Sequence, residues 1–218
     1  SQVPSYYIYP AGEYSAKGYR FSVNMYSSYD DDGSVGVIYT NDSNSNRGYM
    51  YKVGTNIYKI SGGTLNGCKI GFTSNKMIVT GNSSTDGGII YKIRPEGDIV
   101  FAKTLIPANQ GLATLNHLRV ARNGNILVGG SGNKGYYALL RNDGTALYSG
   151  TSNGSVRGVG MNRTTGESVV TTYDVNARRG TFVRILPTGK AEFDRTIDGN
   201  FDKIKVTNNG EVLLLSSD

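Results

Sequence analysis

One short phrase returns along this chain at nearly regular intervals. A turn dipeptide followed by an apolar run stands at residues 75–81 (NKMIVTG) and 123–130 (NGNILVGG), and related versions stand at 166–172 (GESVVTT) and 210–216 (GEVLLLS). The spacing is roughly forty to fifty residues, which is the range of supersecondary repeats that stack into solenoids or propellers. The chain is therefore expected to be built from copies of one unit.

Each unit contains four short strands separated by turn residues. Asn, Asp and Gly pairs such as Asn123-Gly124 and Asn209-Gly210 lie between the first and second strands, where positive φ favours a hairpin. The first strands are predicted at 21–24, 68–71, 118–121, 158–161 and 204–207, and the second at 35–39, 77–81, 126–130, 168–172 and 212–216. The third are predicted within 48–54, 88–97, 135–144 and 180–189, and the fourth at 55–60, 98–103, 145–150 and 190–195.

The fifth unit stops after its second strand at Asp218, and its missing half stands at the other end of the chain. Residues 5–17 carry a strand, a Pro-Ala-Gly turn and another strand. We therefore predict an all-β fold, a five-bladed β-propeller with four-stranded blades in a single domain over 1–218. A β-sandwich is the alternative, but it gives no reason to repeat one four-strand pattern. The predicted blades are 19–61, 66–104, 116–150, 157–197, and 201–218 combined with 3–17.

Composition narrows the possible chemistry. Among 218 residues there are one cysteine, Cys68, and one histidine, His117, which together cannot form a Cys/His metal site or an intramolecular disulfide. We predict no metal and no cofactor. No apolar run approaches the roughly 18 residues of a membrane helix, so membrane insertion is not expected. The formal charge of +6 favours acidic or phosphate-bearing partners.

One face of the predicted propeller carries long polar loops, at 40–48, 80–88, 104–117, 150–157 and 171–180. Variable loops on a rigid scaffold are the usual place for binding. Tyrosine rings beside Asn and Asp suit sugars, since a ring face stacks and polar groups bind hydroxyls. The simpler alternative is that these residues only solvate the loops. The candidate loop-face residues are Tyr19, Asn41, Asp42, Tyr173 and Asp174.

Cations recur on the first strands. Lys69, Arg119 and Lys205 align at one position, with Ser22 in another unit. Arg20, His117 and Lys203 align two residues earlier, on the same side of a strand, with Gly67 in another unit. Six cations near the central axis would favour an anionic ligand. The alternative is that their stems pack between blades while their charged ends reach water.

No catalytic signature is present in the sequence. The predicted inner strands offer no carboxylate pair of the kind that glycosidases use, and there is no nucleophile elbow, P-loop or zinc-protease motif. We predict a protein that is not an enzyme, with a glycoside hydrolase as the less favoured alternative. A basic stripe interleaved with aromatic residues is also missing, which argues against nucleic acid as a partner.

The phrases NGNILVGG, NKMIVTG and GEVLLLS resemble the short-blade propeller repeats of bacterial and bacteriophage proteins, of the delta-60 type. The resemblance covers nearly the whole chain. It implies a propeller and a virion component such as a tail or receptor-binding module. The tryptophan-containing sugar sites of five-bladed lectins have no counterpart here, since the chain has no tryptophan.

These observations lead to a functional hypothesis. We expect a recognition module that binds a host-surface glycan or another anionic surface ligand, as part of a phage virion or tail. The alternative is a structural or assembly protein that docks onto another virion or cellular protein. The expected location is a virion or the extracellular space, or alternatively a secreted or periplasmic protein whose signal peptide has been removed.

Overall fold

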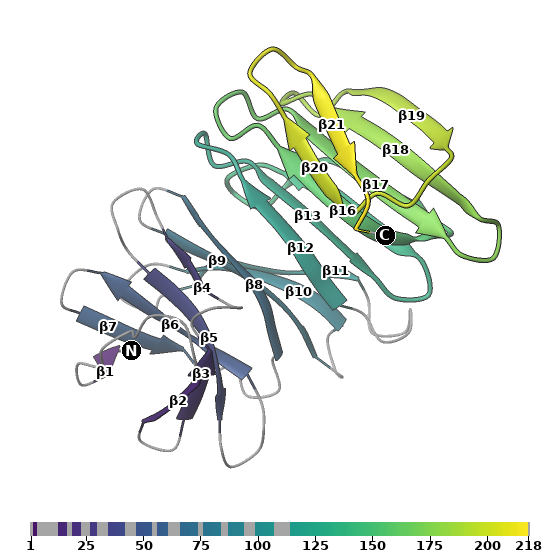
Figure 1. Cartoon of the computed structure of the whole chain (residues 1–218). Helices are drawn as coiled ribbons and strands as arrows, with labels where there is room; N and C mark the ends of the chain where they lie inside the picture. Colours follow the sequence, from purple (N-terminus) through teal and green to yellow (C-terminus); the bar gives the residue numbers. More distant parts are fainter. Residues whose placement is uncertain are drawn as a thin grey trace. The chain divides into compact units, whose positions relative to one another are not determined.

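The structure is a computed structural model (Figure 1). It describes residues 2–3, 13–16, 19–22, 27–29, 35–41, 47–53, 56–60, 66–73, 76–83, 87–93, 99–106 and 114–217. Side chains are described at residues 80, 87–92, 100–106, 115–192 and 195–217. The secondary structure of these parts of the chain consists of β-strands, paired antiparallel. They include no helix with the length and apolarity to cross a bilayer.

The first of two compact units, residues 1–108, holds two sheets. In the larger sheet the order is β1-β7-β6-β5-β3-β2, and β4 also pairs with β5. Its strands are β1 (Gln2–Val3), β2 (Glu13–Ala16), β3 (Tyr19–Ser22), β4 (Ser27–Tyr29), β5 (Val35–Asn41), β6 (Arg47–Val53) and β7 (Asn56–Ile60). The smaller sheet has the order β11-β10-β9-β8 and contains β8 (Asn66–Thr73), β9 (Lys76–Ser83), β10 (Gly87–Ile93) and β11 (Ile99–Ile106).

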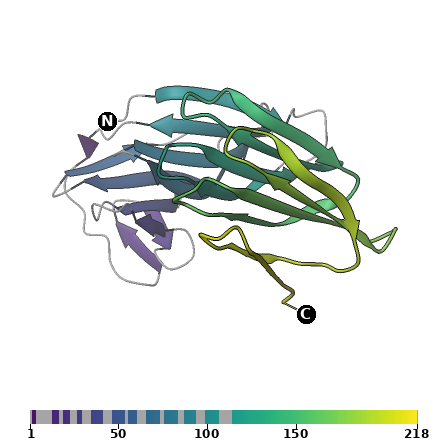
Figure 2. The ribbon, with the colours of Figure 1, turned by 90° about the horizontal axis from the view of Figure 1, so that it is seen from above.

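The second unit, residues 109–218, holds two four-stranded sheets and a two-stranded sheet. Figure 2 shows its sheets stacked in chain order, from teal to yellow. The first sheet contains β12 (Thr114–Val120), β13 (Ile126–Ser131), β14 (Gly135–Leu140) and β15 (Ala146–Ser152). The second contains β16 (Ser155–Met161), β17 (Ser168–Asp174), β18 (Arg179–Ile185) and β19 (Ala191–Ile197), and the last contains β20 (Lys203–Val206) and β21 (Val212–Leu215).

The predicted four-strand unit is confirmed in three sheets. In β8–β11, β12–β15 and β16–β19, each strand pairs antiparallel with the next strand along the chain. The predicted turns have the expected geometry, because their glycines adopt positive φ, as at Gly124 (91°) and Gly210 (80°). The first strand of each of these sheets also has a register irregularity near its start.

The structure does not confirm the predicted completion of the last blade. The strand at 13–16, β2, pairs with β3, whereas β20 and β21 form a sheet of two strands. Only residues 17 and 18 separate β2 from β3, so their pairing closes a short loop at little entropic cost, unlike pairing across the whole chain. Residues 5–9, the predicted third strand, lie outside the described residues.

Two of the predicted long loops are short turns. The loop expected at 171–180 is a turn over 175–178, because β17 extends to Asp174 and β18 begins at Arg179. The loop expected at 150–157 is reduced to residues 153 and 154. Thr, Ser and Tyr at these strand ends continue the ladder, as residues that favour β-structure do when a partner strand is in register.

The core of the second unit lies between its two four-stranded sheets. Side chains of β13 and β14 pack with side chains of β16, β17 and β18 in one cluster. Leu127, Leu139, Val170, Val183 and Ile185 are fully buried in it. Apolar side chains of the two sheets face one another, which gives the packed core that the sequence pattern predicts.

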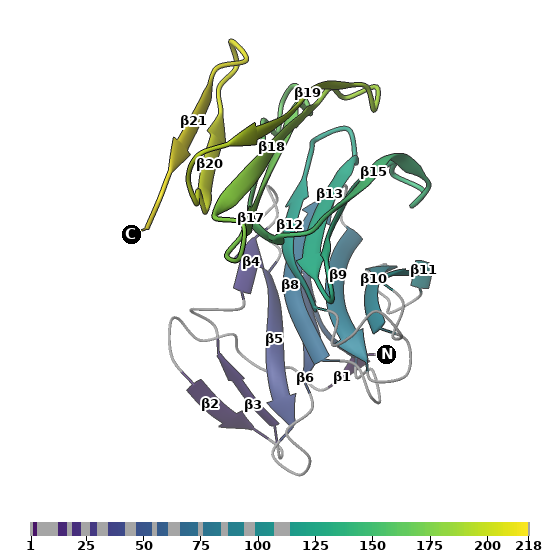
Figure 3. The same ribbon diagram turned by 90° about the vertical axis from the view of Figure 1, so that its right-hand side faces the viewer.

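One face of the C-terminal hairpin packs on the preceding sheet, β16–β19. Figure 3 shows β20 and β21 beside β17 and β18. A Cβ atom on Gly160 of β16 would lie 2.5 Å from Ile204 Cγ2, so only glycine permits this close approach. Ile204 and Val206 point toward β16 and β17, and Lys203 and Lys205 alternate with them and are exposed.

Candidate functional site

A polar hollow of about 260 Å³ opens at one end of the second unit. It lies where the short β15–β16 connection meets the turn between β17 and β18. Most of its lining side chains are hydroxyl, amide or charged groups. The lining residues are Tyr137, Thr151, Ser152, Asn153, Gly154, Thr172, Asp174, Ala177, Arg179, Gly180, Thr181 and Thr196.

A chain of three hydroxyls runs through this hydroxyl-lined hollow. Ser152 Oγ lies 2.9 Å from Thr172 Oγ1, and Thr172 Oγ1 also contacts Thr181 Oγ1 within hydrogen-bond distance. The Gly154 amide donates to Ser152 Oγ at 3.1 Å. Three strands, β15, β17 and β18, thus contribute to one connected polar network.

The carboxylate of Asp174 organises the turn at the rim. Its Oδ1 accepts hydrogen bonds from the amides of Asn176 at 3.0 Å and Ala177 at 3.3 Å. Arg178 then adopts a positive φ of 55°, which is rare for a residue with a side chain. This conformation ends the turn in four residues and starts β18 at Arg179, which also lines the hollow.

Gly154 allows the two connections to meet. A Cβ atom at this position would lie 2.4 Å from the carbonyl carbon of Tyr173 and 2.5 Å from the Asp174 amide nitrogen. Backbone atoms cannot move aside as a flexible side chain can, so any larger residue would separate the connection from β17. The close contact therefore holds the two halves of the hollow together.

The arrangement offers donors and acceptors of several kinds. Neutral hydroxyls occupy the interior, one carboxylate and one guanidinium lie on the lining, and the Tyr137 ring is 5% exposed. Hydroxyls both donate and accept hydrogen bonds, whereas the carboxylate only accepts and the guanidinium only donates. Such a set matches a ligand that carries several hydroxyl groups.

The predicted loop-face residues lie in different parts of the molecule. Asp174 lines the hollow, and Tyr173 is the half-buried neighbour whose backbone lies against Gly154. Tyr19 begins β3 and Asn41 ends β5, where these two residues pair with each other. Asp42 lies outside the described residues.

The structure describes the side chains of four of the six predicted cations. Arg20 lies on β3 and Lys69 on β8 in the first unit, and their side chains are not among those described. His117 and Arg119 lie on β12, whereas Lys203 and Lys205 lie on β20. Within the second unit β16 contacts both strands, and it carries no cation at the equivalent positions.

The equivalent positions are identified by matching turn hydrogen bonds. Backbone amides of Ala121, Asn162 and Thr207 each donate across the first turn of their sheet, to the carbonyls of Asn125, Glu167 and Glu211. This alignment places Gly158 and Gly160 of β16 where β20 carries Lys203 and Lys205. Glycine occurs there because β20 packs directly on β16.

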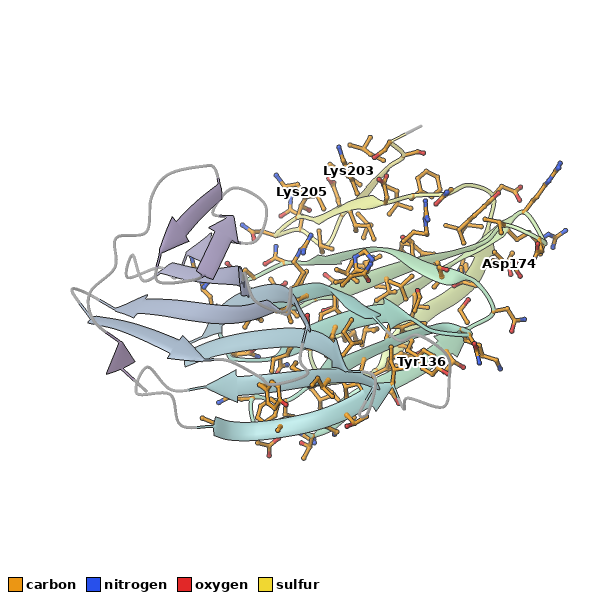
Figure 4. The ribbon with its side chains drawn as sticks, turned by 90° about the horizontal axis from the view of Figure 1, so that it is seen from below. Tyr136, Asp174, Lys203 and Lys205 are labelled. Carbon is orange, nitrogen blue, oxygen red and sulfur yellow. The ribbon has the colours of Figure 1, made fainter. Side chains whose placement is uncertain are left out.

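The individual cations have different surroundings. Arg119 is exposed, yet desolvation by the surrounding protein lowers the pKa of its guanidinium, which donates from Nη1 to the Leu118 carbonyl at 2.8 Å. His117 is half-buried opposite Gly129. Figure 4 shows Lys203 and Lys205 along β20, well away from Asp174. Lys203 and Lys205 are therefore separate from the hydroxyl-lined hollow.

Sequence reasoning missed most of the hollow. Ser152, Thr172 and Thr181 come from three strands, and the spacing in sequence does not indicate that they meet. The available signal was the cluster of hydroxyl residues at the strand ends, GTS at 150–152 and TTYD at 171–174. Among the residues described, no group of three His, Cys, Asp or Glu side chains is placed to hold a metal ion.

Comparison with known proteins bears on the fold alone. No protein-family model and no curated protein matches the chain. Solved β-propeller proteins are similar in structure. The Dos1 propeller has a TM-score of 0.56 at 11% identity, over 90% of this chain and 59% of that chain. A chain of the mitotic checkpoint complex has a TM-score of 0.53 at 10% identity, over 93% and 73%.

An enzyme is also among the similar structures. Prolyl oligopeptidase B from Galerina marginata has a TM-score of 0.53 at 13% identity, over 90% of this chain and 30% of that chain. The present chain thus spans less than a third of that protein. Taken together, these similarities support the β-propeller fold that the repeat predicts.

Proposed function

We propose that the chain is a recognition module, without catalytic activity, that binds a glycan at the hydroxyl-lined hollow. The observation that carries this proposal is the connected network of Ser152, Thr172 and Thr181 beside Asp174 and Arg179. Sugar hydroxyls both donate and accept, so they can join such a network at either end. The volume of 260 Å³ equals about nine water molecules, which suits one small polar unit of a longer chain.

The ligand class follows from the lining. A neutral or amino sugar would place hydroxyls on the threonines and one donor on the Asp174 carboxylate. A carboxylated or sulfated sugar would use the Arg179 guanidinium, which binds anions in a bidentate manner. The exposed lysines Lys203 and Lys205 form a second candidate contact for an anionic glycan. Salt should weaken binding at these lysines more than binding at the hydroxyls.

Glycan-array and calorimetric binding test the proposal with the full chain. Thr172→Val and Thr181→Val keep the side-chain shape but remove the hydroxyl, and each should weaken binding at least tenfold. Asp143→Asn is the control outside the hollow and should leave binding unchanged. Asp143 organises the β14–β15 turn by accepting a hydrogen bond from the Thr145 amide at 3.0 Å. Binding that survives both valine substitutions and fails only in Lys203→Gln with Lys205→Gln would move the site to β20.

The biological setting is part of the same proposal. The short-blade repeats suggest a part of a phage virion or tail that contacts the host surface, and a secreted or periplasmic protein is the alternative. For the fold, we propose five blades, because five strands occupy the first position of a unit, namely β3, β8, β12, β16 and β20. Only two strands of the fifth blade are in the described sheet.

A second candidate function is assembly with another protein. The observation that favours it is the outer face of the C-terminal hairpin, where Leu213 is 53% exposed and Leu215 is 63% exposed. Lys205 lies opposite Leu213 and Lys203 opposite Leu215 in the β20–β21 register. Neighbouring exposed apolar side chains of this kind can mark a contact with another protein.

A further inference from the structure

Two rows of side chains on one face of the sheet β16–β19 line the hydroxyl-lined hollow. In the register of β17, β18 and β19, Thr172 lies opposite Thr181, and Thr181 lies opposite Thr196. Two residues farther toward the turn, Asp174 lies opposite Arg179. Opposed residues, and residues two apart in one strand, lie on the same face of a sheet. A row of hydroxyls therefore lies beside a carboxylate and a guanidinium, and all five side chains line the hollow.

The Asp174 carboxylate is held in place with one oxygen left over. Its Oδ1 accepts hydrogen bonds from the amides of Asn176 and Ala177, which fix the carboxylate at the end of β17 (Figure 4). Neither Asp174 Oδ2 nor the Arg179 guanidinium has a hydrogen-bond or ion-pair partner among the residues that the structure describes. One acceptor and one set of donors thus remain available, on side chains whose Cβ atoms are about 5 Å apart.

The neighbouring carboxylate decides which group the guanidinium binds best. An anionic group on Arg179 would lie next to the Asp174 carboxylate, and the two negative charges would repel. Exposed charges that stand at this end of the two sheets without lining the hollow are Lys134, Arg157, Arg178 and Asp198. Charges exposed in this way contribute little at physiological salt. A neutral hydroxyl is compatible with both groups, because it donates to a carboxylate and accepts from a guanidinium.

Two neighbouring hydroxyls of a sugar ring match the pair of Asp174 and Arg179. One hydroxyl of such a vicinal diol donates to Asp174 Oδ2, and the adjacent one accepts from the guanidinium. The row of threonines lies two residues, or about 7 Å, farther along the strands. A pyranose ring with a hydroxyl on each side spans that distance. A third hydroxyl then joins the chain of side-chain hydroxyls at Thr181, which is half-buried.

We infer that the hollow binds one neutral pyranose unit through a vicinal diol held between Asp174 and Arg179. This inference rests on the proposed function, and it selects uncharged sugars with free neighbouring hydroxyls from the glycans that the function allows. Since the ligand carries no net charge, its binding should change little with salt. Since the turn amides already fix the carboxylate, the ligand meets a preorganised acceptor.

The test uses the full chain and three neutral polysaccharides as probes, dextran, mannan and galactomannan, with binding followed by biolayer interferometry. Periodate cleaves the carbon–carbon bond between neighbouring hydroxyl-bearing carbons, and borohydride then reduces the resulting aldehydes to alcohols. The treated polymer stays neutral and hydroxylated but has lost its diols. We expect at least one probe to bind equally at low and at physiological salt, and the treatment to weaken that binding at least tenfold.

Three variants locate the diol. Asp174→Asn keeps an oxygen for the turn amides but replaces the free acceptor with a donor, and should weaken binding at least tenfold. Arg179→Lys keeps the charge but loses the planar set of donors, and should also weaken binding. Asp198→Asn is the matched control and should leave binding unchanged, because this exposed carboxylate follows β19 at the same end and does not line the hollow.

A double variant tests whether one diol joins the two side chains. If the same pair of hydroxyls binds both, combining Asp174→Asn with Arg179→Lys should weaken binding by less than the product of the two single losses. Thermal unfolding checks that each variant folds. Losses that multiply would mean that Asp174 and Arg179 bind separate groups, which would overturn the diol.

Failure of this inference can be told from failure of the proposed function. Binding that survives periodate and borohydride, or that is found only with dextran sulfate and disappears with salt, would overturn the neutral diol while glycan binding stands. Full binding by Asp174→Asn together with loss in Thr172→Val would do the same. Absence of binding to dextran, mannan, galactomannan and dextran sulfate would overturn the diol and count against the glycan proposal itself.

Discussion

The third strands of two neighbouring sheets, β14 and β18, occupy the same place in the repeat but have different environments. Tyr137 and Leu139 of β14 are 5% and 0% exposed, because the sheet β16–β19 packs over them. Phe182 and Arg184 stand in the same positions of β18 and are half-buried beside a groove. The burial of a residue in a stacked repeat thus depends on the sheet that packs over it and not on its own sheet.

The largest expected effect tests this difference directly. Leu139→Ala should lower the free energy of unfolding by about 3 kcal/mol, because it opens a cavity in a fully buried cluster. Phe182→Ala should cost about 1 kcal/mol, since part of its ring is already in contact with water. Urea unfolding of the two variants gives the comparison. Equal losses would mean that something covers β18 as completely as β14.

A smaller effect is expected where the hairpin meets β16. Gly160→Ala should destabilise by about 1–3 kcal/mol, because the new methyl group would lie 2.5 Å from Ile204 Cγ2 and 2.8 Å from Ile204 Cβ. The same substitution combined with Ile204→Ala should cost less than the sum of the two single changes. Additive losses measured by urea unfolding would contradict direct packing between these residues.

The ion pair at Arg184 stabilises the exposed side of β18. This side chain contacts the Glu167 carboxylate, lies 3.7 Å from Glu192 and donates to the Gly210 carbonyl at 2.7 Å. Arg184→Met should cost about 1–2 kcal/mol, because the poorly exposed Glu167 loses its charged partner. Adding Glu167→Gln should recover part of that loss. If it does not, the arginine acts mainly through the Gly210 carbonyl.

The smallest effect concerns the end of β21. The hydroxyl of Ser217 donates to the Asp202 carboxylate, as does the Ser217 amide at 2.9 Å, and these bonds hold the carboxyl pKa below its usual 3.8. Since this pKa is lower in the folded chain, the stabilisation exists above the unfolded value and disappears as pH falls through the folded value. The protection factor of the Ser217 amide, which compares its exchange rate with that of an unstructured chain at the same pH, should therefore fall in acid. Asp202→Asn should remove that dependence, with unchanged protection of the amides in β13.

Local features of the fold could be predicted from sequence. The runs at 126–130 and 168–172 became β13 and β17 because their pattern requires burial on a sheet. Turn glycines such as Gly144 and Gly189 have positive φ, as the turn sequences demand. These features depend on neighbouring residues only, so a single sequence contains the necessary information.

Features that depend on distant pairing could not be predicted in this way. The last blade was expected to draw strands from residues 5–17, yet β2 pairs with its neighbour β3. The expected loop at 171–180 became strand, because β18 continues the ladder to the pair of Asp174 and Arg179. Choice of partner is a competition between alternatives, and periodicity alone does not rank them.

The site shows the same limit. Asp174 was predicted as a ligand contact because it stands beside a tyrosine in an expected loop; in the structure it ends β17 and lines the hollow, and its role in binding stays a prediction. The period of two also placed Lys203 and Lys205 on one exposed side of β20. Their grouping with His117 and Arg119 stays a prediction, and β16, which contacts both strands, has Gly158 and Gly160 at the equivalent positions, where β20 packs on it.

The hydroxyl chain from Ser152 through Thr172 to Thr181 has one consequence for selectivity. In both of its contacts, either oxygen can be the donor. Rotation of the hydroxyl hydrogens therefore reverses the direction of the whole chain without displacing a heavy atom. At one end the chain can therefore either accept a hydrogen bond from a ligand or donate one to it. Ligands that donate and ligands that accept can both bind there without a change of fold.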